Sequence, residues 1–287
     1  MPGLMAATAL APSGDGYRAM LDPAWDIWGP AGGYIAAIAL RAVRERAAEG
    51  HRPASLMGQF VRVAKPGAID VAVEAVKEGG SALYLVTLAQ EGRPVFLAQI
   101  WTTKRSEASL PVTPVMPDVP APEALRGQDE LLAERGIAWN RFWGNLDGRP
   151  VHFRLAEDPP APVPSQRRWL RFRDWPGAGE GEPGGAAGDE AAGDPFLDAM
   201  RTALLIDLGI WPGHWHRLQE NADYLAPSLD LTVYFHGSGP AGDWLLSDAD
   251  SDVSGNGLIS GRVRIWSRDG RALATGSGHC LVTRPRG

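Results

Sequence analysis

The chain has 287 residues, enough for one large domain or two ordinary ones and for a complete hydrophobic core. Hydrophobic residues make up 44% of it and charged residues 22%, a globular composition that excludes general disorder. The formal net charge of −6 at pH 7 argues against a general attraction to nucleic acid or to an anionic membrane surface. We therefore expect a folded protein with no nucleic-acid partner.

The cysteine content and the short apolar segments indicate where in the cell the protein is located. Cys280 is the one cysteine, so an internal disulfide and a cysteine metal cluster are both excluded. The longest apolar run, residues 32–40, ends at Arg41 and is far shorter than the roughly 20 residues that cross a bilayer. Residues 1–11 contain no Lys or Arg and lack the charged region of a signal peptide. These features predict a cytoplasmic protein without a membrane span.

Residues 16–105 read as one unit that contains a single helix. A strand over 17–21 leads into a loop that ends in Gly29-Pro30-Ala31-Gly32-Gly33, and a helix follows from Tyr34 to about Glu49. The first half of this helix is apolar on nearly every face, which is typical of a helix enclosed by protein. Four strands are predicted after it, over 55–63, 69–77, 82–90 and 94–103, divided by Gly-containing turns.

Two segments rich in Pro or Gly divide the rest of the chain. Residues 106–122 hold five prolines and predict an extended connector rather than a packed element. Residues 177–193 consist mainly of Gly, Ala, Glu and Asp and predict a mobile loop. We place an N-terminal unit at 1–105, a Pro-rich linker at 106–138 and a C-terminal unit at 139–287.

The C-terminal unit repeats the order of elements in the first. A helix is predicted over 194–216, beginning at Asp194-Pro195 with a stop near Gly209 and Pro212. Four strands follow again, over 228–236, 244–253, 257–267 and 272–284, and the preceding strand has candidates at 151–155 and 168–173. An apolar helix can cover the buried face of each antiparallel sheet, and two such units can pair through edge strands. The sequence thus predicts a pseudo-dimer within one chain.

Several segments in this order resemble a known family, the double-hotdog acyl-CoA thioesterases. The resemblance covers most of the chain and rests on residues 29–37, Phe60, 66–67, 80–81 and 90–96 in the first half, and on 227–236, 244–246 and 269–274 in the second. It implies an α+β double hotdog, in which two tandem repeats each wrap an antiparallel sheet around a long helix. The implied activity is hydrolysis of an acyl-CoA thioester to free acid and CoA.

The resemblance also implies three catalytic positions around the attacking water: an Asp, a Thr or Ser, and a Gln. The matching residues are Asp207, Ser228 and His279, although a shift of one residue puts Gly278 in the last position. Asp207 interrupts the apolar run 204–208, where a carboxylate without partners is costly. A histidine could hold the same water or act as a base. The alternatives are a hydrated carboxylate, a turn serine after Pro227 and a hydrogen-bonded strand histidine.

Thioester hydrolysis also needs donors for the developing oxyanion, and it needs no metal or other cofactor. Backbone N–H groups at the helix start could supply them, which selects Gly32, Gly33 and Tyr34. The alternative is that these glycines only permit a tight strand-to-helix turn. The resemblance further implies an acyl chain lying in a tunnel between the two helices.

The sequence is compatible with two other functions. A hotdog hydratase or dehydratase commonly uses an Asp and His pair, so His279 keeps that activity as an alternative. A non-catalytic acyl-thioester binding protein is another, because the fold alone does not fix the function. His214-Trp215-His216 lacks a further ligand cluster nearby, and we therefore expect no metal. Hotdog proteins usually associate further, so a homo-oligomer is possible. The acyl-chain length depends on the depth of the tunnel and cannot be predicted from the sequence.

Overall fold

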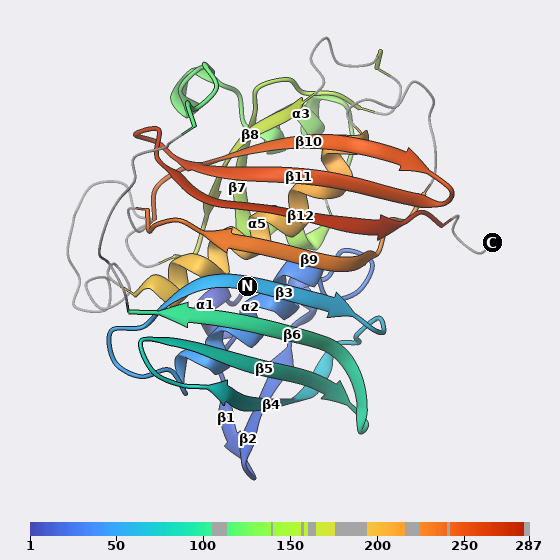
Figure 1. Ribbon diagram of the computed structural model, residues 1–287. Coiled ribbons are helices and arrows are strands. Elements are labelled where there is room, and N and C mark those ends of the chain that lie inside the picture. The colour runs from blue at the N-terminus through green and yellow to red at the C-terminus, as the bar shows by residue number, and fades with distance from the viewer. Residues whose placement is uncertain are drawn as a thin grey trace.

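The computed structural model describes residues 1–104, 114–138, 140–155, 158–159, 165–175, 194–215, 224–239 and 242–283, with only the backbone of Trp215. The predicted loop 177–193 and the expected start of the second unit at Trp139 lie outside the described residues. The described strands form one 12-stranded antiparallel sheet. Figure 1 shows this sheet in front, with the two long helices packed behind it.

The first repeat follows the predicted order of elements. Its strands are β1 (Ala11–Ser13), β2 (Gly16–Leu21), β3 (Arg52–Phe60), β4 (Gly67–Lys77), β5 (Ser81–Gln90) and β6 (Arg93–Thr103). A short helix α1 (Leu4–Ala7) precedes them, and the central helix is α2 (Gly32–Arg44). α2 ends at Arg44, before the predicted Glu49, and the chain tightens just beyond it, where the Arg46 N–H bonds to the carbonyl of Val43 three residues earlier.

The second repeat has the same order, with two corrections. Its elements are β7 (Leu146–Pro150), β8 (Ser165–Phe172), α5 (Pro195–Trp215), β9 (Ser228–Phe235), β10 (Leu245–Gly255), β11 (Leu258–Ser267) and β12 (Ala272–Leu281). The strand predicted over 151–155 is wrong: β7 ends at Pro150, and the Val151 N–H makes one further bond, to the carbonyl of Arg167, before the chain leaves β8. The stop predicted near Gly209 and Pro212 is also wrong, since α5 continues to Trp215.

The strand order makes the internal repeat explicit. Read from outside to centre, the first repeat runs β2-β4-β5-β6-β3 and the second runs β8-β10-β11-β12-β9. The innermost strands β3 and β9 pair antiparallel, from Ser55 opposite Tyr234 to Gln59 opposite Asp230. The pairing of β3 with β9 joins the strands on either side of it into one continuous sheet.

The main core lies between the sheet and the two long helices. α2 is buried from Gly33 to Leu40, and α5 contributes buried side chains that include Met200, Leu204 and Ile206. Burying one such large aliphatic side chain is worth about 1.5–3 kcal/mol. The helices approach closely at Gly33, where an added Cβ would lie 2.5 Å from the Cα of Leu204. Only glycine fits this crossing without moving a backbone.

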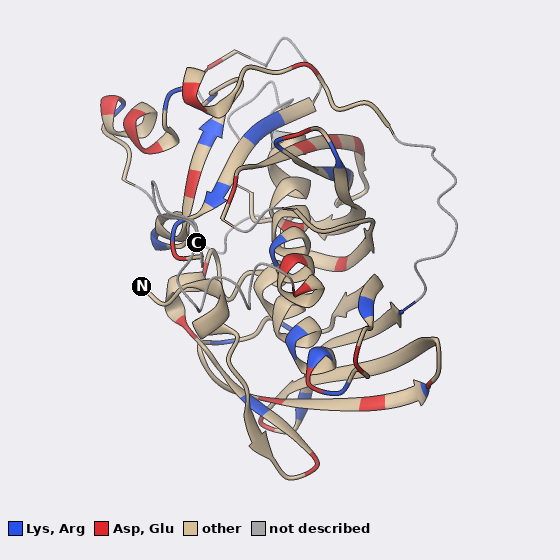
Figure 2. Ribbon diagram, turned by 90° about the vertical axis from the view of Figure 1, so that its left-hand side faces the viewer, with Lys and Arg blue, Asp and Glu red and all other residues tan. Residues whose placement is uncertain are grey.

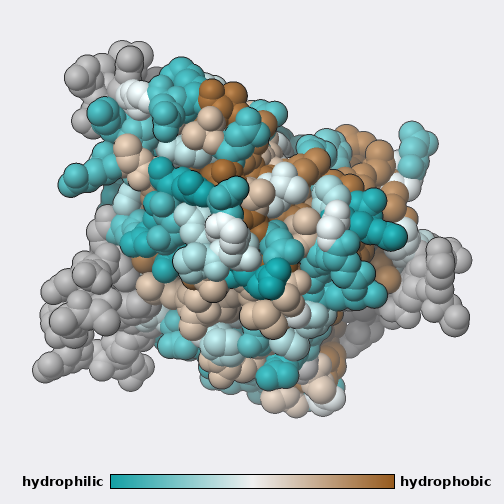
Figure 3. Space-filling view, turned by 90° about the horizontal axis from the view of Figure 1, so that it is seen from below, coloured by the Kyte–Doolittle hydropathy of each residue, from teal (hydrophilic) through white to brown (hydrophobic). Residues whose placement is uncertain are grey.

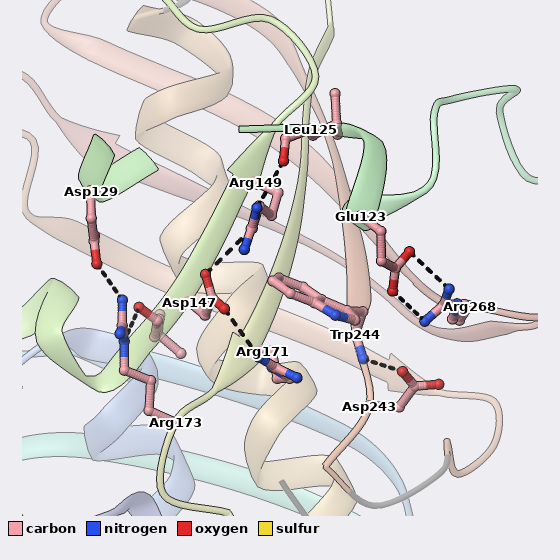
Figure 4. Close-up of polar contacts among 11 residues, drawn as sticks. Glu123, Leu125, Asp129, Asp147, Arg149, Arg171, Arg173, Asp243, Trp244 and Arg268 are labelled. Atoms are coloured by element: carbon pink, nitrogen blue, oxygen red, sulfur yellow. Dashed lines mark hydrogen bonds and ion pairs between the residues drawn. The ribbon is translucent and has the colours of Figure 1, made fainter. Parts of the chain in front are cut away.

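The described residues of the connecting segment, 114–138, pack on the outer face of the second repeat, and Met116 and Val119 correct the prediction of an unpacked connector for their part of 106–122. The segment contains a 3₁₀ turn (Pro122–Ala124) and helix α3 (Gln128–Glu134). Its apolar residues Met116, Val119 and Leu125 cover a cluster made by Trp169, Trp244, Leu246 and Trp266. Figure 4 shows Arg149 donating to the carbonyl of Leu125 at 2.8 Å and Glu123 pairing with Arg268. The prolines leave the segment irregular, but the apolar residues between them still bury surface.

The surface carries both signs of charge. In the ribbon of Figure 2, the positions of Lys and Arg are scattered among those of Asp and Glu and are not gathered in one region. The face seen from below mixes hydrophilic residues with small apolar patches (Figure 3). Among the described residues, the helices are too short or too polar to span a bilayer.

Candidate active site

The carboxylate of Asp207 lies where α5 crosses the start of α2 and the start of β9. Its Oδ1 accepts a hydrogen bond from the Ser228 hydroxyl at 2.8 Å, and its Oδ2 accepts one from the Gly33 N–H at 2.7 Å. The structure thus brings together three of the residues selected from the sequence. Asp207 comes from the middle of α5, Gly33 comes from the start of α2, and Ser228 comes from the start of β9.

A β-bulge turns Ser228 toward this site. Asp230 of β9 pairs with His279 of β12, but the next pair is Ser228 with Cys280, so Leu229 has no counterpart. Successive side chains on a strand point to opposite faces, and one extra residue therefore reverses the direction of those beyond it. Without the bulge, Ser228 would point to the same outer face as Asp230.

The two glycines at the start of α2 let the carboxylate approach the helix backbone. An added Cβ at Gly32 would lie 3.0 Å from Oδ1 of Asp207 and 2.8 Å from Cζ of Phe60. The first N–H groups of a helix have no partner within the helix and attract negative charge. Gly33 gives its N–H to Asp207, while the N–H of Gly32 has no acceptor among the described residues. These glycines therefore do more than permit a tight turn.

The pKa of Asp207 is raised above its ordinary value of 3.8. Burial is the largest cause, because it removes the charged carboxylate from water, while the hydrogen bonds from Ser228 and Gly33 act in the opposite direction. Among the described residues, no Lys or Arg lies close enough to offset the burial. Asp207 is therefore a carboxylate with increased affinity for a proton, which is the property required of a general base.

Tyr34 does not belong to the site. Its hydroxyl donates to the carbonyl of Ala7 at 2.7 Å, its ring stacks on Trp25, and burial raises its pKa to about 12. Its backbone N–H bonds to the carbonyl of Ala31 and is not free for a ligand. The prediction of Tyr34 as an oxyanion donor is wrong, because the first helical turn closes on that N–H.

His279 is also placed away from Asp207. Its Nδ1 lies 2.9 Å from Oδ2 of Asp230, and its side chain is 54% exposed on the outer face of the sheet. The neighbouring Gly278 faces α5, where an added Cβ would lie 2.6 Å from Ile210. His279 therefore cannot hold a water against Asp207, and Gly278 has no side chain with which to do so.

The residue of β12 that does face the site is Cys280, which sequence reasoning missed. It is buried opposite Ser228, and burial raises the pKa of its thiol to about 12, with the charge of Asp207 acting in the same direction. The thiol is therefore protonated at neutral pH and is a poor nucleophile. Cys280 faces the same side of β12 as Gly278, and the bulge at Leu229, which no feature of the sequence marks, places Ser228 opposite it.

The His214-Trp215-His216 segment falls partly outside the described residues. His214 Nδ1 lies 3.1 Å from the Ser251 hydroxyl, and His216 is not described. Within the described ranges, no group of three or more His, Cys, Asp or Glu side chains is arranged to hold a metal.

Solved structures define the class of fold. A conserved protein of unknown function with a hot dog fold from Alicyclobacillus acidocaldarius superposes with a TM-score of 0.78 at 20% identity, covering 99% of this chain and 98% of that one. An acyl-CoA thioesterase II, TesB2, from Mycobacterium marinum gives a TM-score of 0.75 at 22% identity, covering 99% of both chains. The chain has a hotdog fold, as predicted.

The family follows from sequence comparison. Residues 21–103 match the acyl-CoA thioesterase N-terminal domain, and residues 117–282 match the acyl-CoA thioesterase C-terminal domain. Human acyl-coenzyme A thioesterase 8 is 27% identical over 273 residues, covering 86% of this chain and 80% of the human protein. The chain belongs to the acyl-CoA thioesterase family and is a thioester hydrolase, which confirms the prediction from the sequence.

Proposed function

We propose that Asp207 is the general base by which this chain hydrolyses an acyl-CoA thioester to a free acid and CoA. The observation that carries the proposal is the carboxylate held by Ser228 and Gly33 without a neighbouring cation among the described residues. A carboxylate so placed can accept a proton from water, and its raised pKa improves its strength as a base. Ser228 orients the carboxylate and the attacking water.

The proposed reaction balances with these groups. Water attacks the thioester carbonyl carbon as its proton passes to Asp207, and negative charge develops on the carbonyl oxygen. The N–H of Gly32, at the start of α2, has no acceptor among the described residues and is the proposed donor to that oxygen. Collapse of the tetrahedral intermediate breaks the C–S bond, and the departing CoA sulfur takes the proton from Asp207. The reaction requires no metal.

The domain organisation is part of the proposal. We infer a double hotdog with units at 1–105 and 139–287, joined by the segment 106–138. The repeated strand order supports two units, and the pairing of β3 with β9 joins them at the centre. We further propose a reducing, cytoplasmic location, supported by the lone buried thiol of Cys280.

The hydratase alternative loses its main support. It depended on His279 beside Asp207, and these side chains lie on opposite faces of the sheet. Asp207 and Ser228 supply a base and an orienting hydroxyl, which hydrolysis uses.

The test is a panel of acyl-CoAs of increasing chain length, incubated with the purified protein and a thiol reagent. Release of free CoA that depends on enzyme concentration would support the proposal. Addition of water to crotonyl-CoA without CoA release would contradict it and favour a hydratase. Protection from thermal unfolding with neither reaction would show an acyl-thioester binding protein and would also contradict it.

A further inference from the structure

Helix α5 contains a proline where its hydrogen-bond ladder should continue. Pro212 lies inside the helix, which runs on to Trp215. In an α-helix each N–H bonds to the carbonyl four residues earlier, and proline has no N–H. The carbonyl of Leu208 therefore lacks the donor that any other residue at 212 would provide.

Arg168 of β8 supplies a donor to this carbonyl. Its guanidinium Nη2 lies 3.3 Å from the oxygen of Leu208, and its plane packs over the ring of Trp143 at 4.8 Å. The side chain is only 3% exposed. Arg168 of β8 thus supplies the hydrogen bond that the backbone of α5 lacks at Pro212.

The hydrogen bond to the carbonyl of Leu208 is the main polar contact of Arg168 among the described residues. Burial lowers the pKa of Arg168 to about 10, and no carboxylate among the described residues offsets that burial. The other deeply buried arginine, Arg201, is paired with Asp198 in its own helix. A buried charge without a counter-ion is costly, so the hydrogen bond to Leu208 offsets only part of the cost.

We propose that Arg168 is a positioning residue for the hydrolytic reaction: it replaces the donor missing at Pro212 and fixes the turn of α5 that begins directly after Asp207. Leu208 directly follows Asp207, and the turn it begins ends at Pro212. With this turn fixed, the carboxylate stays within hydrogen-bond distance of Ser228 and Gly33. The proposal rests on the proposed function, because it assigns Arg168 to the same site.

The test is a double-mutant cycle between Arg168 and Pro212. Arg168→Met keeps an unbranched apolar stem and removes every donor, and we expect kcat per folded protein to fall about tenfold with KM within about twofold. Pro212→Ala restores an N–H opposite the carbonyl of Leu208. The double variant R168M/P212A is therefore expected to recover kcat to within about threefold of Pro212→Ala alone.

Arg201→Met is the matched control, since it removes a buried arginine from the same core. It should lower the melting temperature, and its effect should be the same with and without Pro212→Ala. An unchanged kcat in Arg168→Met, or a loss of kcat that Pro212→Ala fails to repair, would overturn the proposal.

A second measurement does not depend on activity. The pKa of Asp207 can be followed in the free protein by ¹³C NMR of its carboxyl carbon, assigned with Asp207→Asn. Cys280 is the titratable group that faces Asp207, and its pKa of about 12 keeps it protonated throughout. In Arg168→Met the pKa of Asp207 should rise further, because the loosened turn weakens the hydrogen bonds from Ser228 and Gly33 that lower it, and it should fall back in R168M/P212A.

The two readouts separate the two claims. If the parent protein releases no CoA but the NMR cycle behaves as expected, the proposed function is wrong and the positioning role stands. If the parent is active and the NMR titration of Asp207 is unchanged in Arg168→Met, the positioning role is wrong.

Discussion

Each long helix begins with an N–H bonded to a carboxylate, but the two carboxylates differ in origin and in partner. At the start of α2, the Gly33 N–H bonds to Asp207, which comes from α5. At the start of α5, the Phe196 N–H bonds at 2.9 Å to Asp194, which directly precedes its own helix. Asp194 is paired with Arg44 of α2, whereas Asp207 has a serine hydroxyl and, among the described residues, no cation.

The strands beside these two helix starts also correspond. In β3 and β6 a register shift pairs Pro53 with Thr102 and then Ser55 with Trp101, the same pattern that pairs Ser228 with Cys280 in the second repeat. Pro53 therefore takes the place of Ser228 and has no hydroxyl. A cavity of about 30 Å³ lies beside it, large enough for about one water molecule.

We call each place where a helix start, a carboxylate and a bulged strand meet a corner. One corner contains Gly33, Asp207 and Ser228, and the other contains Phe196, Asp194 and Pro53. The repeated backbone provides both corners, and the side chains make only the first suited to chemistry. An ion-paired carboxylate beside proline holds two helices together. A carboxylate with a raised pKa beside serine can take a proton from water. The following substitutions test that difference.

Asp207→Asn should have the largest effect, a loss of hydrolysis of at least about a hundredfold, because the amide cannot accept the proton of the attacking water. Stability should behave differently. The raised pKa means that the protonated carboxyl favours the folded state, and this contribution is lost as pH rises through that pKa. At pH 8 the variant should melt no lower than the parent. Turnover within about threefold of the parent would contradict the assignment.

Ser228→Ala should lower kcat/KM about tenfold. The hydroxyl lowers the pKa of Asp207 by hydrogen bonding to its charged form, so its removal should move the acid limb of the pH profile to higher pH. Ser277→Ala, an exposed serine on β12, is the control and should change neither quantity. An acid limb that stays in place would show that Ser228 does not act on Asp207.

Asp194→Asn makes the same chemical change at the other corner. It weakens the pair with Arg44 and the bond to the Phe196 N–H, at a cost of about 1–2 kcal/mol. Differential scanning calorimetry should show a lower melting temperature, by about 2–8 °C, with kcat unchanged. A loss of kcat comparable with that of Asp207→Asn would mean that the two corners are not chemically distinct.

His279→Ala should have the smallest effect, with kcat and KM both within about twofold of the parent values. The side chain lies on the outer face, where it contacts Asp230. Steady-state kinetics would return the histidine to the mechanism if kcat fell more than about tenfold.

The order of elements could be predicted because Gly and Pro turns divide the chain in the same sequence twice. Asp207 could be selected because it interrupts an apolar helix. The side of the sheet to which a residue points could not be predicted, since the bulge at Leu229 arises from pairing between β9 and β12. His279 was selected from the resemblance to the family, and Cys280 was missed because the resemblance implies a Gln at that position and not a thiol. The continuation of α5 past Pro212 also depends on a distant residue, Arg168.

The pH dependence of kcat/KM, measured for the parent and for Asp207→Asn, tests the role of this carboxylate most directly. We predict that the parent loses activity in acid with an apparent pKa above 3.8, because the base must be ionised to accept a proton. The residual activity of the Asn variant should show no such limb. An identical acid limb in both proteins would contradict the account, since some other group would then be the base.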